Sequence, residues 1–215
     1  MHKQMTVLLF AGACWAAYAQ TAAPAKSVPA KAAPLKTTMA KAAPVAAASA
    51  QKLLPAQSSI HFTSTQMGVP VQGRFTRMTG TVQFDAKNLA ATRIAIDVPV
   101  ASATLDSEDA DAELPKADWF DAAAFPQASF VLNDAKAIGQ GQYEVQGSLR
   151  IKGQSLPIKS TVQMTQNQGI TWASGSFRIS RLAYKIGSGP WGDTSVVADP
   201  VDVKYKIAIS GISSF

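Results

Sequence analysis

The chain has 215 residues, of which 47% are hydrophobic and 16% charged, and this composition predicts one globular domain. Its formal net charge is +6, yet the first 52 residues hold 6 of the 20 basic residues and none of the 14 acidic ones. The remainder is therefore neutral, which argues against a nucleic-acid groove, because such grooves need basic residues clustered on a folded face.

The N-terminus has the pattern of a secretory signal peptide. His2 and Lys3 precede an apolar run from Thr6 to Trp15, and Ala17-Tyr18-Ala19 supplies small residues before a cut at Gln20. The run is shorter than the roughly 20 residues that span a bilayer, which disfavours a membrane anchor. We therefore expect residues 1–19 to be removed on export to the periplasm.

Cys14 is the only cysteine, and cleavage after Ala19 removes it. The mature chain then has no thiol, so no disulfide stabilises the fold. A lipoprotein cut before Cys14 is the less favoured alternative, because Ala11-Gly12-Ala13 lacks the large aliphatic residue usual at such sites.

Residues 20–55 are rich in Ala, Pro and Lys, and up to residue 55 they contain no acidic side chain. This composition predicts a disordered tether, with the folded domain over residues 56–215. The tether is expected to act as a spacer, and its lysines can also contact anionic surfaces of the cell envelope.

From Ser59 onward apolar residues recur with period two, which is typical of half-buried strands. Expected strands lie near residues 59–65, 82–84, 94–96, 128–132, 143–151, 156–164, 170–179 and 201–209. Short turn signals such as Lys152-Gly153 favour antiparallel hairpins between neighbours. The pattern predicts an all-β fold, an antiparallel barrel of about eight strands, with a sandwich as the alternative.

One helix interrupts the strands. The segment 106–121 has seven acids and one lysine, and it predicts a short helical crossover over residues 107–114 that Pro115 ends. Asp106 or Ser107 is expected to cap its first turn. The acids match no Ca²⁺-loop spacing, so we interpret them as a solvated helix face and predict no metal site.

Few residues suited to catalysis are present. His2 leaves with the leader, so His61 is the only histidine of the mature chain, which excludes a multi-histidine zinc site. The removal of Cys14 likewise excludes a thiol nucleophile. Gly187-Ser188-Gly189 lacks the downstream Lys-Ser/Thr of a phosphate-binding loop. We predict no catalytic residue and no cofactor. The alternative is an unusual hydrolase or isomerase that uses Asp and Arg alone, for which Asp109 and Asp193 are the candidates.

Several sequence blocks resemble the YceI-like family of periplasmic lipid-binding proteins, from residue 58 to the end. They are Ser58-Ser59-Ile60-His61-Phe62, Gly73-Arg74-Phe75, Lys116-Ala117-Asp118-Trp119-Phe120-Asp121, Phe125-Pro126-Gln127-Ala128-Ser129-Phe130, Gly147-Ser148-Leu149-Arg150-Ile151-Lys152-Gly153, and Trp191-Gly192-Asp193. The resemblance implies a lipocalin-like barrel that holds an isoprenoid or acyl lipid, such as a polyisoprenoid, a quinone tail or a fatty-acid derivative. It implies no catalytic residue.

The candidate ligand site has an apolar and a polar part. The apolar lining is expected from Phe62, Phe75, Trp119, Phe120, Phe130, Phe177 and Trp191. The polar headgroup contacts are assigned to Gln66, Arg74 and Arg181, although arginines on strands more often face outward. Many family members have a histidine where this chain has Gln66. The alternative function is an envelope module with a filled barrel and no ligand.

Overall fold

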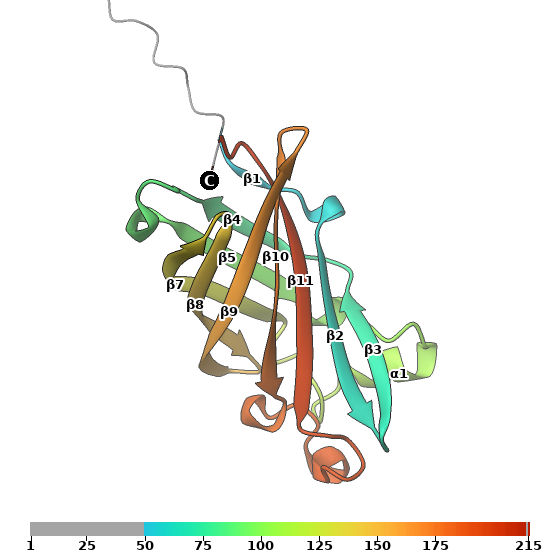
Figure 1. Ribbon diagram of the computed structural model, residues 1–215. Coiled ribbons are helices and arrows are strands. Elements are labelled where there is room, and N and C mark those ends of the chain that lie inside the picture. Colours follow the sequence, from blue (N-terminus) through green and yellow to red (C-terminus); the bar gives the residue numbers. More distant parts are fainter. Residues whose placement is uncertain (1–49, 214) are drawn as a thin grey trace, which may run out of the picture. The chain divides into compact units, whose positions relative to one another are not determined.

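Residues 50–213 and 215 are described by the computed structural model, and they form one curled antiparallel sheet (Figure 1). The strands are β1 (Lys52–Leu53), β2 (Ser59–Gln66), β3 (Val69–Phe75), β4 (Thr79–Gln83), β5 (Arg93–Pro99), β6 (Ala103–Thr104), β7 (Gln127–Gly139), β8 (Gln142–Ile151), β9 (Gln154–Asn167), β10 (Ile170–Ser180) and β11 (Pro200–Ser210). The helical elements are α1 (Glu108–Glu113) and five short 3₁₀ turns, Pro55–Gln57, Leu89–Ala91, Val100–Ser102, Leu182–Tyr184 and Gly189–Gly192. None of the described helices is long and apolar enough to span a membrane. The expected signal peptide and residues 20–49 of the expected tether lie outside the described residues.

The strand order is β4-β5-β7-β8-β9-β10-β11-β2-β3-β6, with β1 paired to the end of β11. The predicted all-β antiparallel architecture is confirmed. Two of the eleven strands have only two residues, so nine longer strands stand where about eight were expected. The strand β3 was not among the expected strands, because Gly68 and Pro70 at its start are typical of a turn.

The hairpin turns have the geometry that their sequences predict. At Lys152-Gly153, between β8 and β9, both residues have positive φ, at 46° and 75°. The β2–β3 turn, Met67-Gly68, has the same pair of positive φ angles, 49° and 80°. Two successive left-handed residues match the right-handed twist of the flanking strands, which explains glycine at the second position.

No ladder joins β4 and β6, the two ends of the strand path, within the described residues, whereas β1 lies against the β4 end. Near β1 the Gln51 side chain replaces a backbone pair: its Nε2 donates to Phe84 O at 2.7 Å, and Phe84 N donates to its Oε1 at 2.6 Å. Gln51 and β1 therefore belong to the folded domain, which begins before the boundary at residue 56 that composition suggested.

The crossover helix α1 lies within the predicted range, but its first turn is held differently. Neither Asp106 nor Ser107 caps it with a side chain. Instead the Asp111 carboxylate accepts hydrogen bonds from Thr104 Oγ1 at 2.5 Å and from Leu105 N at 2.6 Å. These bonds lower the pKa of Asp111 and tie the helix to β6.

Candidate ligand-binding lumen

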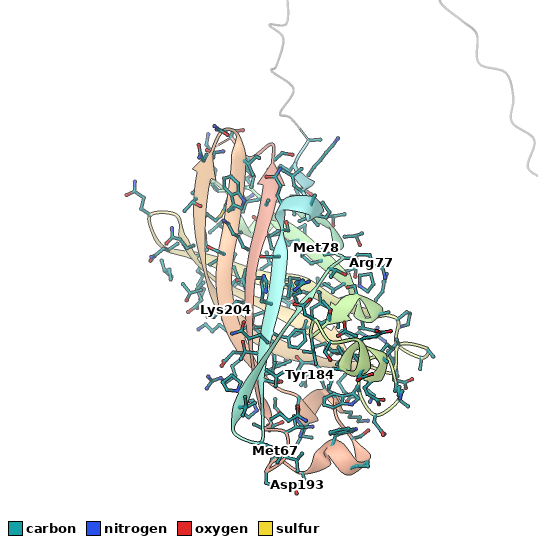
Figure 2. The ribbon with its side chains drawn as sticks, turned by 90° about the vertical axis from the view of Figure 1, so that its right-hand side faces the viewer. Met67, Arg77, Met78, Tyr184, Asp193 and Lys204 are labelled. Carbon is teal, nitrogen blue, oxygen red and sulfur yellow. The ribbon has the colours of Figure 1, made fainter. Side chains whose placement is uncertain are left out.

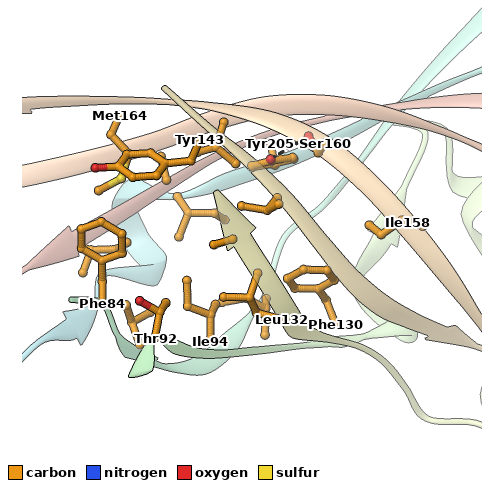
Figure 3. Close-up of a pocket in the computed structure, with 18 of the residues that line it drawn as sticks. Phe84, Thr92, Ile94, Phe130, Leu132, Tyr143, Ile158, Ser160, Met164 and Tyr205 are labelled. Carbon is orange, nitrogen blue, oxygen red and sulfur yellow. Dashed lines mark hydrogen bonds between the residues drawn. The ribbon is translucent and has the colours of Figure 1, made fainter. Parts of the chain in front are cut away.

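The interior of the curled sheet contains two adjoining cavities. The first, the apolar compartment, has a volume of about 160 Å³ (Figure 3). Its wall consists of Ile60, Val82, Phe84, Thr92, Ile94, Ile96, Phe130, Leu132, Ala135, Tyr143, Val145, Leu149, Ile158, Ser160, Val162, Met164, Ala173, Phe177, Val203, Tyr205, Ile207, Ile209 and Ile212. Nearly all are hydrocarbon side chains, and none is exposed at the outer surface.

The second cavity, the helix-side compartment, has a volume of about 240 Å³. It is bounded by the end of β2, by β3, and by the halves of β10 and β11 next to the loop that joins them. The helix α1 and that loop complete its wall. Its wall consists of Ile60, Phe62, Ser64, Gln66, Val71, Phe75, Val98, Leu105, Ala110, Glu113, Leu114, Trp119, Phe120, Ala128, Leu149, Ile151, Phe177, Ile179, Arg181, Ile186, Trp191, Val197, Val201 and Val203. Gln66, the last residue of β2, is exposed, so this compartment reaches the surface beside the β2–β3 turn. Figure 2 shows Met67 of that turn and Asp193 at the same end of the domain.

Four side chains, Ile60, Leu149, Phe177 and Val203, line both compartments. The two cavities therefore adjoin across this shared belt, and we call them together the lumen, with a summed volume of about 400 Å³. Most inward residues of this belt remain partly accessible although they face away from the outer surface. A solid, side-chain-filled barrel would bury them completely, so the interior is hollow.

Glycines opposite aromatic rings create this space. A Cβ at Gly73 would lie 2.3 Å from the ring of Phe62, its cross-strand partner. A Cβ at Gly147 would lie 2.1 Å from the ring of Phe130. Each ring thus rests over bare backbone and leaves the centre of the lumen open.

A hydroxyl pair is built into the wall of the apolar compartment. Tyr205 and Ser160 are joined by a hydrogen bond of 2.9 Å, and Ser160 Oγ donates to Ser176 O at 2.9 Å (Figure 3). Since Ser160 donates to a carbonyl, Tyr205 donates to Ser160, and both protons are satisfied. Burial raises the pKa of Tyr205, so its phenol stays neutral in this compartment.

The family model of the YceI-like domain matches residues 52–209. The chain belongs to the YceI-like family.

Among solved structures, the crystal structure of Burkholderia cenocepacia BcnA superposes with a TM-score of 0.70 and 34% sequence identity, covering 73% of this chain and 99% of that chain. A polyisoprenoid binding domain from Saccharophagus degradans, implicated in plant cell wall breakdown, has a TM-score of 0.60 and 14% identity, covering 75% and 98%. At this low identity, the second structure shows that the two proteins share a fold and no more.

Among curated relatives, a UPF0312 protein of Vibrio cholerae is 32% identical over 104 residues, which are 48% of this chain and 55% of that protein. A UPF0312 protein of Pectobacterium atrosepticum is 26% identical over 144 residues, which are 65% of this chain and 72% of that protein. The chain thus matches about half the length of its Vibrio relatives.

The aromatic residues expected to line the YceI-like lumen all face it. Phe130 lies in the apolar compartment and Phe177 in the shared belt, whereas Phe62, Phe75, Trp119, Phe120 and Trp191 lie in the helix-side compartment. The rings of Trp119 and Trp191 pack with centroids 5.4 Å apart and close one side of it. Their contact with a ligand stays a prediction.

The three expected headgroup residues lie in different surroundings. Gln66 lies at the rim of the helix-side compartment. Arg74 faces outward from β3, where it forms an ion pair with Asp106 and lines neither compartment. An outward Arg74 cannot reach a headgroup in the lumen, so this assignment is corrected.

Arg181 is 2% exposed, and backbone carbonyls occupy its whole guanidinium group. Nε donates to Ala198 O at 3.1 Å, Nη1 to Ile186 O and Gly187 O at 2.9 and 2.8 Å, and Nη2 to Trp191 O and Val197 O at 2.8 and 2.6 Å. All five N–H donors are used, which leaves none for a headgroup. Arg181 instead fixes the loop between β10 and β11, which carries Trp191.

The aliphatic residues that make up most of the lining were not predicted from the sequence. Residues such as Ile94, Val145 and Ala173 follow the same period-two alternation as the aromatic residues on their strands. Their inward direction could have been inferred from that alternation. The amount of empty space could not, because it depends on which ring faces which glycine across the sheet.

Proposed function

We propose that this protein is an exported carrier that holds one amphiphile by its long apolar tail inside the lumen, and that it performs no chemistry. The observation that supports this is the hollow, carbon-lined interior, open beside Gln66. The likeness to a domain described as polyisoprenoid binding agrees with it.

The lumen suggests the size of the tail. An engineered apolar cavity of about 150 Å³ binds one benzene molecule, so about 400 Å³ has room for roughly 15 carbon atoms. Each buried methylene contributes about 0.8 kcal/mol, so about ten of them give roughly 8 kcal/mol before association costs. Polar contacts are therefore not required for retention, and an isoprenoid or acyl tail of this length fits. A longer tail would extend past Gln66 into solvent.

The direct test is native mass spectrometry of the protein purified without detergent, followed by identification of any extracted lipid. We expect a bound amphiphile at a ratio of one to one. Protein that carries no lipid and takes up no alkyl chain from 8 to 16 carbons would overturn the proposal.

A matched pair of variants tests whether the ligand binds inside the lumen. Val203→Trp puts a large ring into the shared belt and should abolish uptake, whereas Val131→Trp adds the same ring on the exposed outer face of β7 and should not. Circular dichroism establishes that both variants are folded. Unchanged uptake by folded Val203→Trp would remove the lumen as the site.

Export has a separate test. The mature protein should begin at Gln20 when recovered from the periplasmic fraction, and Ala19→Arg should block cleavage. A mature chain that begins at an acylated Cys14 would support the lipoprotein alternative instead.

A further inference from the structure

The rim of the helix-side compartment offers neutral hydrogen-bonding groups. Ser64 and Gln66 both line it from β2. Throughout residues 50–213 and 215, neither side chain has a hydrogen-bond partner within the protein. A hydroxyl and a carboxamide each donate and accept, so together they can satisfy an uncharged polar end of a ligand.

The cations near this compartment are not available to a ligand. Arg181 directs its five N–H groups at backbone carbonyls, as described above. Lys152, also buried, donates to Ala117 O at 2.6 Å and to Lys185 O at 2.8 Å, and it lines neither compartment. Arg74 is outside and paired with Asp106. Within the described part of the chain, no lysine or arginine with a free donor lines the lumen.

The charges near the compartment offer an anion no free partner. Glu113 of α1 is the one carboxylate that lines the compartment, and it pairs with Lys116 on the surface. The segment 106–121 carries seven acids against that one lysine, and one of the seven, Asp106, pairs with Arg74. Among the residues that the structure describes, the lining therefore holds one carboxylate and no cation that is free to bind an anion.

From these three observations we propose that the lumen selects amphiphiles with an uncharged, hydrogen-bonding polar end, such as a hydroxyl or an amide, and rejects carboxylate or phosphate headgroups on the same tail. An anion drawn in by its tail would lose its hydration beside Glu113 and find no cation to replace it. This inference rests on the proposed lumenal binding of a tail.

The test compares two ligands of one chain length, dodecan-1-ol and dodecanoate, at pH 7.5. Binding is followed by tryptophan fluorescence, because Trp119 and Trp191 line the compartment, and dissociation constants are confirmed by calorimetry. We expect dodecanol to bind at least tenfold more tightly. Equal or tighter binding of dodecanoate overturns the selectivity while leaving the carrier function intact, whereas binding of neither ligand overturns the carrier function itself.

A charge added at the rim should weaken the preference. Gln66→Lys puts an ammonium group at the opening and should raise the affinity for dodecanoate relative to dodecanol by about tenfold. Gln72→Lys adds the same charge on the exposed outer face of β3 and should leave that ratio unchanged. An equal shift in both variants would show that general electrostatic attraction, and not the rim, sets the ratio, which also contradicts the proposal.

Discussion

The two compartments of the lumen are built in different ways. The wall of the apolar compartment comes mostly from long strands, whose period-two alternation sends one hydrocarbon side chain after another inward, with a register shift in β7 after Leu132. Ten of the 24 residues that line the helix-side compartment lie outside the strands, in the segment 105–120 around α1 and in the loop that Arg181 holds. Strand alternation thus produces a nearly uniform apolar surface in the first compartment. The helix-side compartment adds polar groups from β2, Ser64 and Gln66, and one carboxylate from α1, Glu113.

The largest expected effect tests whether Arg181 is what holds the loop between β10 and β11 in place. Arg181→Met should lower the free energy of unfolding by about 4 kcal/mol or more, because several buried charge-assisted hydrogen bonds are lost at once. Urea unfolding measures this. Arg178→Met is the matched control, since Arg178 forms only an exposed ion pair with Asp202, and little change is expected. A loss below 1 kcal/mol for Arg181→Met would show that the loop is held by other contacts.

The second test uses one glycine from each compartment. Gly73→Ala forces the Phe62 ring into the helix-side compartment, and Gly147→Ala forces the Phe130 ring into the apolar one. Each should cost about 1–3 kcal/mol of stability through overpacking. Gly192→Ala, with no atom within 4 Å of its added Cβ, is the control.

These glycine variants should differ in ligand binding. Gly147→Ala should weaken dodecanol more than octanol, because a short tail need not enter the apolar compartment. Gly73→Ala should weaken both alcohols alike. If both variants weaken dodecanol and octanol to the same extent, the short tail must also reach the apolar compartment, which would contradict this expectation.

A smaller effect is expected from filling the apolar compartment. Ala173→Leu adds three carbons to its wall and should stabilise the ligand-free protein by about 1 kcal/mol. The preferred alcohol should become shorter by about three carbons. Thermal unfolding and a chain-length series measure the two changes, with the exposed Ala183→Leu as control. An unchanged length optimum would place the tail elsewhere.

The smallest expected effect concerns the attachment of α1. The bonds from Thr104 and Leu105 lower the pKa of Asp111 in the folded state. Its contribution to the stability of the fold is therefore fully present above the unfolded pKa of about 3.9. It is lost as the pH falls through the folded value. Asp111→Asn should therefore melt below the parent at pH 5–7, and the difference should shrink below pH 4. Asp109→Asn, which removes a carboxylate without a described partner, should show no such trend.

The same contrast explains what could be predicted from sequence. Strands β8 to β11 were expected nearly in full, because alternation and glycine turns are local signals. Strand β3 was missed because Pro70 resembles a turn residue. The role of Arg181 depends on carbonyls between residues 186 and 198, whose positions follow from the tertiary fold. The inward aromatic residues were expected, but the hollow they surround depends on cross-strand pairs such as Phe62 and Gly73.

The pairing of β2 with β11 also constrains when the domain can form. Phe62 lies opposite Val203, about 140 positions later in the chain, and β1 likewise pairs with the end of β11. A chain that leaves a ribosome or a translocation channel N-terminus first cannot complete its sheet until the last strand emerges. The high sequence separation of these contacts favours slow closure. The sheet therefore stays incomplete through most of the synthesis of the chain, and β1 has no partner strand until β11 is made.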